Sequence, residues 1–593
     1  MLPTYRYPRF CNSRPAEIGQ LIDRPVLVVG AGPVGLSCAI DLAQRGVPVL
    51  LLDEDDTVSV GSRGLCYAKR TLEILDRLGV AGQVLRKGVS WNVGRTFFAD
   101  QEIYRFELLA ELDHGLPGMV NLQQYYLEQF LVERAMQIPL LEMRCKNRVA
   151  AIDLGDPQRP LLRVETPEGD YLVCAQWVVV ADGARSPIRR QLGLDVEGQV
   201  FRDRFLIADV VMKADFPTER WFWFDPPFHP NQSVLLHRQA DEVWRIDFQL
   251  GWDVDPEEEK KPARVIPRIQ AMLGPEHPFD LEWISVYTFQ CRRMRSFRHG
   301  RVLFAGDAAH QVSPFGARGA NSGVQDADNL GWKLAAVLRG QAPHQLLESY
   351  DQERGFAADE NLHNSTRSTD FITPKSSVSR MFRDAVLLLS RDFAFARALV
   401  NSGRLSVPSF LLDSPLNTPD GPNDRFDGRM RPGAPADDAP ILLQDLPLAA
   451  DGAAPCWLLQ LLGEGFVIMV YAPDESAVVP AMLACSEAAM EASLRLLIVT
   501  GASRSAVGQS VRLGPQGPAV ERIADVREQI VRRYDLRPGT AYLFRPDQHV
   551  LARWRVPTCE QILAAHRRGL GIAATPIASR GERAAQNEGS ACH

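Results

Sequence analysis

Short apolar runs and helically spaced apolar residues alternate near the start of the chain. Val26–Gly30 and Val49–Leu52 are short, continuous apolar runs. Between them, Pro33–Arg45 carries apolar residues at helical spacing, namely Val34, Leu36, Ile40 and Leu42. Short runs of this kind indicate buried strands, whereas helical spacing indicates an amphipathic helix. The pattern predicts a strand, a helix and a second strand within about 30 residues.

The same patterns continue through the middle of the chain. They predict helices at Lys69–Leu78, Gln123–Met136 and Asn321–Arg339, and buried strands at Val178–Ala181 and Arg301–Ala305. Between residues 200 and 290, runs rich in aromatic and β-branched residues are separated by turn residues, namely Arg220–Phe224, Ser233–His237 and Val243–Leu250. Such runs are typical of strands. They predict a β-sheet layer inserted between two halves of an α/β domain.

The last third of the chain falls into three segments of different sequence pattern. Residues 344–402 are predicted to be mainly helical, and residues 412–440 are so rich in proline, aspartate and glycine that they are predicted to form a linker. A separate small α/β domain is expected after the linker. Its predicted strands are Trp457–Leu462, Phe466–Tyr471, Leu494–Val499, Tyr542–Phe544 and His549–Trp554.

Composition and charge exclude several classes of function. The formal net charge is −7 and no basic block stands out, which argues against nucleic-acid binding. The apolar runs are far too short to cross a bilayer, and the first 25 residues lack the apolar segment of a signal peptide. The ten cysteines are scattered, with no CxxC pair and no metal-ligand spacing. We therefore expect a cytoplasmic enzyme without a metal, a membrane partner or a nucleic-acid partner.

The first predicted strand leads into a glycine-rich turn, Gly30-Ala31-Gly32-Pro33-Val34-Gly35. In this pattern the first glycine permits a tight turn, the second lets the backbone approach a pyrophosphate, and the third lets helix and strand pack closely. The helix N-terminus offers unpaired N–H groups to the phosphates. Asp53 follows the second strand, where an acid accepts hydrogen bonds from a ribose. These features predict a dinucleotide site, but alone they do not separate FAD from NAD.

Two further acids at strand ends favour FAD. Asp182-Gly183 follows one predicted strand, and Gly306-Asp307 follows another and precedes a proline- and glycine-rich loop that leads into a helix. An acid in the second position can bind the ribityl hydroxyls, and the N-terminus of the following helix can face a flavin ring. A simple NAD dehydrogenase has no use for this second acid.

Together these motifs resemble those of the class A flavoprotein aromatic hydroxylases, the para-hydroxybenzoate and phenol hydroxylase group. The layout is most similar to 3-(3-hydroxyphenyl)propionate hydroxylase-like enzymes, over about residues 25–400. The resemblance implies an α/β fold with a Rossmann-type FAD-binding domain. It implies this division: 1–24, N-terminal extension; 25–199 and 291–345, FAD-binding domain; 200–290, substrate-binding β-sheet domain; 346–411, helical segment; 412–440, linker; 441–572, thioredoxin-like domain; 573–593, polar tail.

The resemblance also implies which residues contact FAD. The family usually has glutamate where Asp53 stands, and Gln124 matches a flavin-contacting glutamine in a register that Gln123 leaves open by one residue. Arg63 matches an arginine near the route of the nicotinamide cofactor, and Asp182 is associated with both cofactors. The implied set is Gly30, Gly32, Pro33, Gly35, Asp53, Glu54, Arg63, Gln124, Asp182, Gly306, Asp307, Pro314, Gly316, Gly319 and Asn321.

In the implied reaction, NADH or NADPH reduces FAD, which reacts with O2 to a C4a-hydroperoxide that hydroxylates a phenolic substrate. A phenol is most nucleophilic as phenolate, so a nearby base or hydrogen-bond partner would help. On the inserted sheet we expect His237 and Tyr287 to be catalytic, with Trp221, Trp223 and Arg238 in the substrate pocket. Aromatic residues on a sheet are more often core than pocket lining. His310 is expected to support the flavin loop.

The C-terminal segment YLFRPDQHVLARWR resembles the thioredoxin-like domain of the phenol hydroxylase branch. Where a redox thioredoxin has CxxC, this chain reads APDES, so the domain cannot exchange thiols and disulfides. A structural role is expected, at the subunit interface of a homodimer.

Three alternatives to ring hydroxylation stay open to different degrees. Epoxidation or Baeyer–Villiger insertion on a polycyclic substrate is compatible with the same motifs, because a fold does not determine a function. A flavin-dependent halogenase is disfavoured, since its WxWxIP signature is replaced by Trp221-Phe222-Trp223-Phe224-Asp225-Pro226. A non-catalytic flavin-binding protein is disfavoured by the intact loop Pro314–Asn321, which faces the ring in the family.

Overall fold

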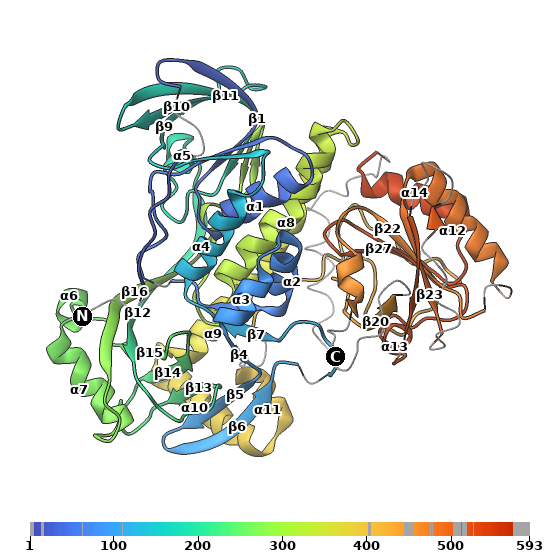
Figure 1. The fold of residues 1–593 in the computed structure, drawn as a ribbon. Coiled ribbons are helices and arrows are strands. Elements are labelled where there is room, and N and C mark those ends of the chain that lie inside the picture. Colours follow the sequence, from blue (N-terminus) through green and yellow to red (C-terminus); the bar gives the residue numbers. More distant parts are fainter. Residues whose placement is uncertain are drawn as a thin grey trace. The chain divides into compact units, whose positions relative to one another are not determined.

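The fold is known from a computed structural model, which describes residues 5–12, 17–61, 63–109, 111–400, 405–443, 456–474, 476, 478–501, 511–512, 519–525 and 527–572. The chain forms two compact units, Met1–Leu338 with Arg354–Ser409, and Arg339–Glu353 with Phe410–His593. Both units combine sheets and helices (Figure 1), which confirms the predicted α/β class. The predicted polar tail, 573–593, lies outside the described residues.

A parallel sheet of order β17-β18-β11-β1-β2-β8 organises the first unit. Neighbours from β18 to β8 all run parallel, while β10 and β9 continue the sheet from β11 as an antiparallel extension. The bounds are β1 Leu21–Val29, β2 Val49–Leu52, β8 Leu141–Arg144, β9 Arg148–Asp153, β10 Leu161–Thr166, β11 Gly169–Val180, β17 Arg298–His299 and β18 Val302–Phe304.

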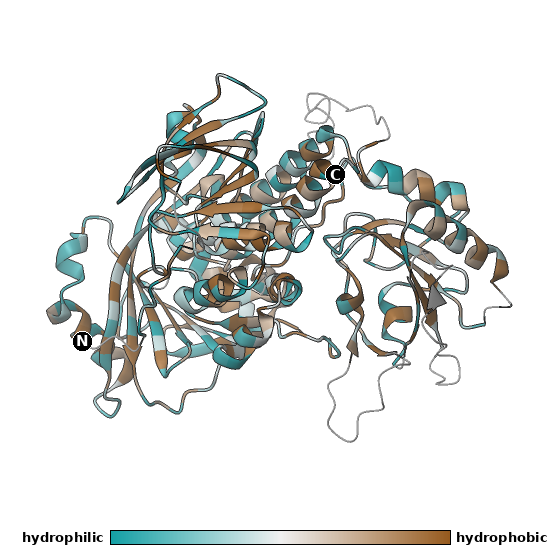
Figure 2. Cartoon of the chain, turned by 45° about the horizontal axis from the view of Figure 1, so that its top comes forward, coloured by the Kyte–Doolittle hydropathy of each residue, from teal (hydrophilic) through white to brown (hydrophobic). Residues whose placement is uncertain are grey.

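The central strands are apolar because both of their faces are covered. Every residue of β2 is buried, and so are the last four residues of β1. Helix α1 packs against α4 and α8, and Figure 2 shows hydrophobic residues concentrated in these strands and helices. The bounds are α1 Pro33–Gln44, α4 Gln124–Ala135, α5 Pro187–Gln191, η1 Gly306–Ala308 and α8 Gly319–Leu338. The predicted strand–helix–strand order is therefore confirmed.

A second, largely antiparallel sheet has the order β19-β16-β12-β15-β14-β13-β5-β6. The last two strands come from before residue 110, so the layer predicted at 200–290 also takes in an earlier segment. The parallel pairing of β13 with β5 makes this join. The bounds are β5 Val93–Phe98, β6 Gln101–Glu107, β12 Val196–Val211, β13 Arg220–Phe224, β14 Ser233–Arg238, β15 Val243–Leu250, β16 Asp280–Met294 and β19 His310–Gln311.

The pleat gives the second sheet two different faces. One face is an apolar core in which Leu206, Leu236 and Ile246 pack with Val265 and Ile269 of a helix, α7. Residues one position along each strand point the other way. That second face carries a buried polar row, described below as the polar face of the sheet. The helices beside this sheet are α6 Pro256–Glu259 and α7 Pro262–Leu273.

Smaller elements complete the first unit. A three-stranded sheet of order β3-β7-β4 is hydrogen-bonded to Asn321 of α8 and, through Asn121, to β14 of the second sheet. The bounds are β3 Cys66–Ala68, β4 Val89–Trp91, β7 Met119–Asn121, α2 Lys69–Leu78, α3 Ala81–Lys87, α9 Glu348–Ile372, α10 Ser377–Asp392 and α11 Ala394–Val400. The first turn of α9, up to Glu353, belongs to the second unit.

The second unit is built on a mixed sheet of order β21-β20-β25-β23-β22-β26-β27, with β24 beside β25. Its core includes Met430, Ala436 and Ala439, so part of the predicted linker 412–440 is packed inside this unit. The likeness to thioredoxin stays a prediction. The bounds are η2 His344–Leu347, β20 Pro440–Leu443, β21 Cys456–Trp457, η3 Leu458–Leu461, β22 Val467–Tyr471, α12 Val479–Ala492, β23 Arg495–Thr500, β24 Val511–Arg512, β25 Ala519–Ala524, α13 Gln529–Arg533, β26 Ala541–Phe544, β27 Val550–Trp554 and α14 Cys559–Gly569.

Candidate functional site

The parallel strands of the first unit end together at one edge of the sheet. Val29 of β1 pairs with Leu52 of β2 and with Val180 of β11, and Val180 pairs with Phe304 of β18. Ligands of open α/β sheets bind outside the carboxyl ends of the strands. The residues at or just beyond these ends are Gly30, Asp53, Asp182 and Asp307. The structure therefore brings the glycine turn and the three predicted acids to one edge.

The glycine turn has the geometry that a dinucleotide requires. A Cβ atom on Gly35 would lie 1.9 Å from the carbonyl oxygen of Gly30, so α1 can pack on the turn only without a side chain there. A Cβ on Gly32 would meet nothing within 4 Å, so the backbone at Gly32 is open to a ligand. Pro33 begins α1. Proline at the first helical position leaves the next free N–H groups for an anion.

Asp53 holds the turn itself. Its carboxylate accepts hydrogen bonds from the backbone N–H groups of Ala31 and, at 2.8 Å, of Asp55. Burial raises its pKa, and these two bonds oppose that shift. Each carboxylate oxygen keeps a second lone pair, so its predicted bond to a ribose stays a prediction. The neighbouring Glu54 is exposed.

The other two acids have unused acceptor oxygens. Asp182 Oδ1 is buried without a hydrogen-bond partner among the described residues, and burial raises the pKa of this carboxyl to about 6. Asp307 is exposed, yet the surrounding protein raises its pKa, with His310 and Arg63 opposing the shift. No donor from the described chain reaches the Asp307 carboxylate. Both acids can therefore accept from ligand hydroxyl groups.

A buried network of polar and charged side chains fixes the turn that carries Asp307. Asp326 Oδ2 accepts from the backbone N–H of Gly306 at 2.9 Å and lies 2.6 Å from His310 Nε2, while Asp326 Oδ1 accepts from Arg354 Nε at 2.6 Å. His310 therefore supports the loop rather than facing a substrate. Asp326 and Arg354 escape a sequence analysis because a charged residue on a helix usually faces solvent. The sequence did offer one indication that Asp326 is buried, because it lies close to the small and apolar residues Gly323, Val324 and Ala327 of α8.

Two amides tie the neighbouring loops to the helices. Gln124 Oε1 accepts from the backbone N–H of Gly64 at 2.7 Å, whereas Gln123 donates to Ala240 O, which favours Gln124 as the residue near the loop of Arg63. Asn321 accepts from Ala68 N and donates to the carbonyl oxygens of Cys66 and Ala317. These bonds fix β3 against the start of α8. Arg63 is exposed and interacts electrostatically with Asp307 and Tyr287.

The loop expected to face the flavin ring lies against the polar face of the second sheet. Phe315 packs on Phe205 and Phe289 with ring centroids 5.0 and 5.3 Å apart. Pro314 is exposed and Gly316 has φ +95°, a left-handed conformation that favours glycine. Gly319 begins α8, so the first N–H groups of this helix point out of the loop.

The pleat separates the residues predicted for substrate binding. Arg220, His237, Arg245 and Asp209 are successive partners across β13, β14, β15 and β12, so they form one row on the polar face. Tyr287 is the partner of Phe205 on the same face. The predicted pocket residues point the other way: Trp221 and Trp223 pack against the α7 core, and Arg238 lies over the Trp244 ring. The structure thus does not place these three beside His237 or Tyr287.

The residues present fit a bound FAD. An open glycine backbone at the start of α1, two carboxylates with unused acceptors and the free N-terminus of α8 match phosphates, hydroxyl groups and a ring that accepts hydrogen bonds. The described residues contain no cluster of side chains suited to a metal ion. Among those residues, no helix is long and apolar enough to cross a membrane.

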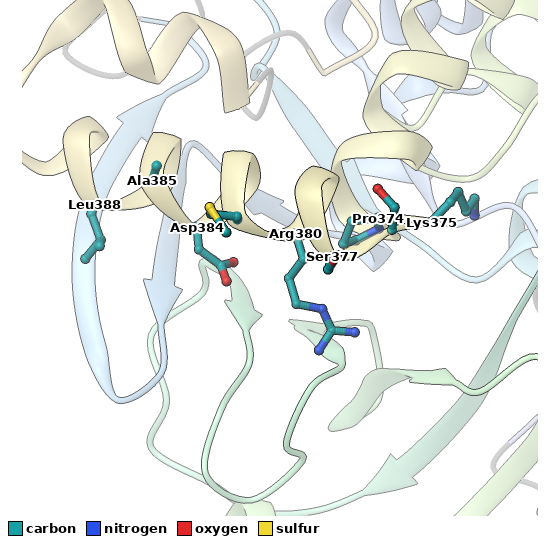
Figure 3. Close-up of a pocket in the computed structure, with 9 residues that line it drawn as sticks. Pro374, Lys375, Ser377, Arg380, Asp384, Ala385 and Leu388 are labelled. Carbon is teal, nitrogen blue, oxygen red and sulfur yellow. The ribbon is translucent and has the colours of Figure 1, made fainter.

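A surface groove of 790 Å³ runs along α10, away from the sheet edge (Figure 3). Its lining includes Lys375, Arg380 and Asp384, and none of the residues predicted for FAD or substrate. The groove is therefore not the candidate site.

A family model for the FAD binding domain matches residues 23–365. The chain belongs to this FAD-binding family. The match covers the parallel sheet, the glycine turn, the three acids and α8, so the FAD cofactor predicted from the motifs is confirmed.

Curated relatives carry names of aromatic hydroxylases. The 3-(3-hydroxy-phenyl)propionate/3-hydroxycinnamic acid hydroxylase of Mycolicibacterium smegmatis is 30% identical over 61% of this chain and 64% of its own length. The probable NADH-specific resorcinol 4-hydroxylase of Rhodococcus jostii is 32% identical over 56% of this chain and 62% of its own length. The matched part spans less than two thirds of these relatives.

Among solved structures, the flavin-dependent monooxygenase PieE, determined with FAD and substrate, is similar with a TM-score of 0.74. It is 21% identical, and the similarity covers 93% of this chain and 100% of PieE. At this identity the likeness shows a shared fold.

Proposed function

We propose that this protein is an FAD-dependent monooxygenase that hydroxylates a phenolic compound with NADH or NADPH and O2. The observation that carries the proposal is the position of the polar face, which includes His237 and Tyr287. This face lies opposite the loop Pro314–Asn321, at the edge of the parallel sheet where FAD would bind. The names of the relatives, which are hydroxylases of phenolic compounds, support the same chemistry.

The chain's own part in the reaction is to hold FAD, to orient the substrate and to exclude water. Gly32 and the start of α1 would bind the phosphates, Asp307 the ribityl hydroxyls, and the loop before α8 the ring. Bound FAD supplies the redox chemistry, in which electrons from NAD(P)H activate O2 for transfer of one oxygen atom. Phe205, Phe289 and Phe315 wall the polar face and keep water from the reacting atoms.

The test is the rate at which NADH or NADPH bleaches the flavin absorbance, with and without a panel of simple phenols. Strong acceleration by one phenol, followed by release of its hydroxylated product, is the expected result. Fast reduction that is indifferent to every phenol would favour epoxidation or Baeyer–Villiger insertion on a non-phenolic substrate. No reduction by either donor would favour the non-catalytic flavin protein.

A homodimer in the cytoplasm is the assembly and compartment that we propose. Large apolar side chains are exposed on α10, namely Val378, Met381 and Phe382. Clusters of this kind on a protein surface mark interaction sites. A second copy of the chain is the partner that we expect there.

A further inference from the structure

A segment near the start of the chain, residues 5–12, lies across the loop of residues 53–65 that joins β2 to β3. Thr57 Oγ1 of this loop donates to Pro8 O of the segment at 2.6 Å. The segment precedes residue 23, where the match to the FAD-binding family begins. Its contacts are therefore a feature of this chain that the family match does not explain. The segment is called the N-terminal strap below.

The strap reaches the edge of the parallel sheet where FAD would bind. Phe10 N donates to Asp56 O at 2.8 Å, three residues past Asp53. Asn12 Oδ1 accepts from Cys145 N at 2.6 Å, and Cys145 directly follows β8. Ligands of open α/β sheets bind outside the carboxyl ends of the strands. The strap therefore passes the ends of β2 and β8 at the edge that receives the ligand.

An aromatic cluster anchors the strap to α4. Tyr5 is buried, its ring stacks on Tyr125 with centroids 4.1 Å apart, and its hydroxyl donates to Gln129 Oε1 at 2.8 Å. Val58 of the loop is buried in the same cluster. Rings of this kind bury a large apolar area with little freedom of movement. The strap, the loop and α4 thus share one small core.

The loop backbone at Gly61 is held by two aromatic residues. Gly61 N donates to the hydroxyl oxygen of Tyr7 in the strap at 3.2 Å. A Cβ atom on Gly61 would lie 2.5 Å from the ring of Trp283 in β16, so the bare backbone packs against this ring. Gly61 also has φ +75°, a conformation that favours glycine. The position of this peptide is therefore closely determined by its surroundings.

Further bonds from α4 hold the loop on both sides of Arg63. Before it in the chain, Ser59 donates to Glu128 through its backbone N–H at 2.6 Å and through its hydroxyl at 2.8 Å. After it, Gly64 N donates to Gln124 Oε1. Because the contacts of the strap and of α4 bracket this residue, they limit where its long side chain can begin.

The side chain of Arg63 extends from this loop toward the candidate site. It is exposed, and its charge lowers the pKa of Asp307 and of Tyr287 against the larger, opposite effect of burial. The guanidinium therefore lies near the acid predicted for the ribityl chain and near the polar face. FAD is an anion because of its pyrophosphate, so a cation at this edge attracts the cofactor.

We propose that Tyr7 is a positioning residue for FAD, which through Gly61 holds the Arg63 guanidinium at the edge where the cofactor binds. This inference rests on the FAD site of the proposed function, but not on its phenol chemistry. Arg63 supplies the charge and the strap supplies its position. Without the Tyr7 hydroxyl the loop loses one of its bonds, and Arg63 must be ordered at the moment of binding, which weakens affinity.

The first experiment measures the FAD dissociation constant of the full-length protein from flavin fluorescence, which rises as diluted holoenzyme releases FAD. Tyr7→Phe keeps the ring and removes the acceptor of Gly61 N, and it should weaken FAD binding about threefold to tenfold, the size of one hydrogen bond. Tyr126→Phe is the matched control. It removes another hydroxyl of the same cluster, which bonds to Asp241 and not to the loop, and should stay within about twofold of wild type.

A double-mutant cycle separates positioning of Arg63 from a general effect on the fold. Arg63→Gln should weaken FAD binding by itself, because it removes the charge. In the Arg63→Gln protein, Tyr7→Phe should have no further effect, since there is no cation left to position. Equal losses from Tyr7→Phe with and without Arg63, or wild-type affinity in Arg63→Gln, would overturn the proposal.

Hydrogen–deuterium exchange of the FAD-loaded protein gives a readout that does not depend on affinity. Peptides that cover the loop should exchange faster in Tyr7→Phe than in wild type, and at the wild-type rate in Tyr126→Phe. Peptides from β1 and α1 should exchange at the same rate in all three proteins. Unchanged exchange of the loop in Tyr7→Phe would show that its hydroxyl does not hold the loop, and the proposal would fail.

The proposed function and this inference fail separately. If Tyr7→Phe weakens FAD binding only where Arg63 is present, but no phenol accelerates flavin reduction, the role of the strap stands and the hydroxylase does not. If phenols accelerate reduction but Tyr7→Phe binds FAD like wild type, the hydroxylase stands and the role of the strap is wrong.

Discussion

Asp326 and His310 lie 2.6 Å apart in the interior of the first unit, and the same carboxylate oxygen accepts the backbone N–H of Gly306. The carboxylate, which also accepts from Arg354, therefore connects two buried side chains to the turn that presents Asp307. Burial alone would raise the pKa of Asp326, but His310 and Arg354 outweigh it and lower the pKa below its usual value. The ionised form is thus the one that the fold uses.

Asp326→Asn should lower the free energy of unfolding by about 3–5 kcal/mol, because it leaves the buried Arg354 guanidinium without its carboxylate partner. Since the folded pKa is depressed, the stabilisation is present above the ordinary aspartate pKa and is lost as pH falls through the folded value. Thermal unfolding and flavin fluorescence against pH measure both effects. Asp359→Asn, which breaks an exposed pair with Arg293, is the control and should change little.

Asp307→Ala should abolish FAD retention, because the Asp307 carboxylate is the acceptor at the end of β18 with no donor from the described chain. The ratio of flavin to protein absorbance after gel filtration measures it. Asp253→Ala removes an exposed acid from the loop between β15 and α6 and should keep full FAD occupancy. A purified Asp307→Ala protein with stoichiometric FAD would contradict our assignment of this residue.

Arg545→Met should destabilise the second unit by about 3–5 kcal/mol. Arg545 is fully buried and bonds to Glu353 at 2.6 Å and to Asp547 at 2.9 Å, so its loss removes the guanidinium that these two buried carboxylates share. Calorimetric unfolding measures the loss. Arg429→Met affects an exposed arginine paired with Asp437 and should cost about 1 kcal/mol or less.

Met381→Glu should convert the proposed homodimer into monomers. Met381 is 71% exposed on α10, where a buried glutamate would oppose pairing of two apolar surfaces. Sedimentation velocity of the FAD-loaded protein gives the mass. Arg391→Glu, at an exposed position on the same helix, serves as the matched control. Wild-type protein that sediments as a monomer would overturn the dimer.

Local signals in the sequence were sufficient to predict the motifs at the edge of the parallel sheet where FAD would bind. The glycine spacing, the helix that starts at Pro33 and the apolar runs before Asp53, Asp182 and Asp307 each depend on neighbouring residues only. Parallel pairing then places every strand end on one edge, so the gathering of these motifs follows from topology.

The substrate side could not be predicted in the same way. Successive residues of a strand alternate between faces, but the sequence does not say which face α7 will cover, so Trp221 and His237 looked equivalent. The pairing of β5 with β13 joins segments far apart in the chain and leaves no local mark. The linker composition indicates turns correctly, but turns can also pack, as Ala436 and Ala439 do.

The pleat of β14 has a consequence for how this protein can change over time. His237 and Arg238 are neighbours in the chain, but His237 lies on the polar face of the sheet and Arg238 lies over the Trp244 ring beside the α7 core. Substitutions at odd and at even positions of the same strand should therefore act on different properties. Changes on the polar face should alter substrate specificity, whereas changes on the α7 face should alter thermal stability. This separation makes the sheet a good starting point for directed evolution toward new aromatic compounds.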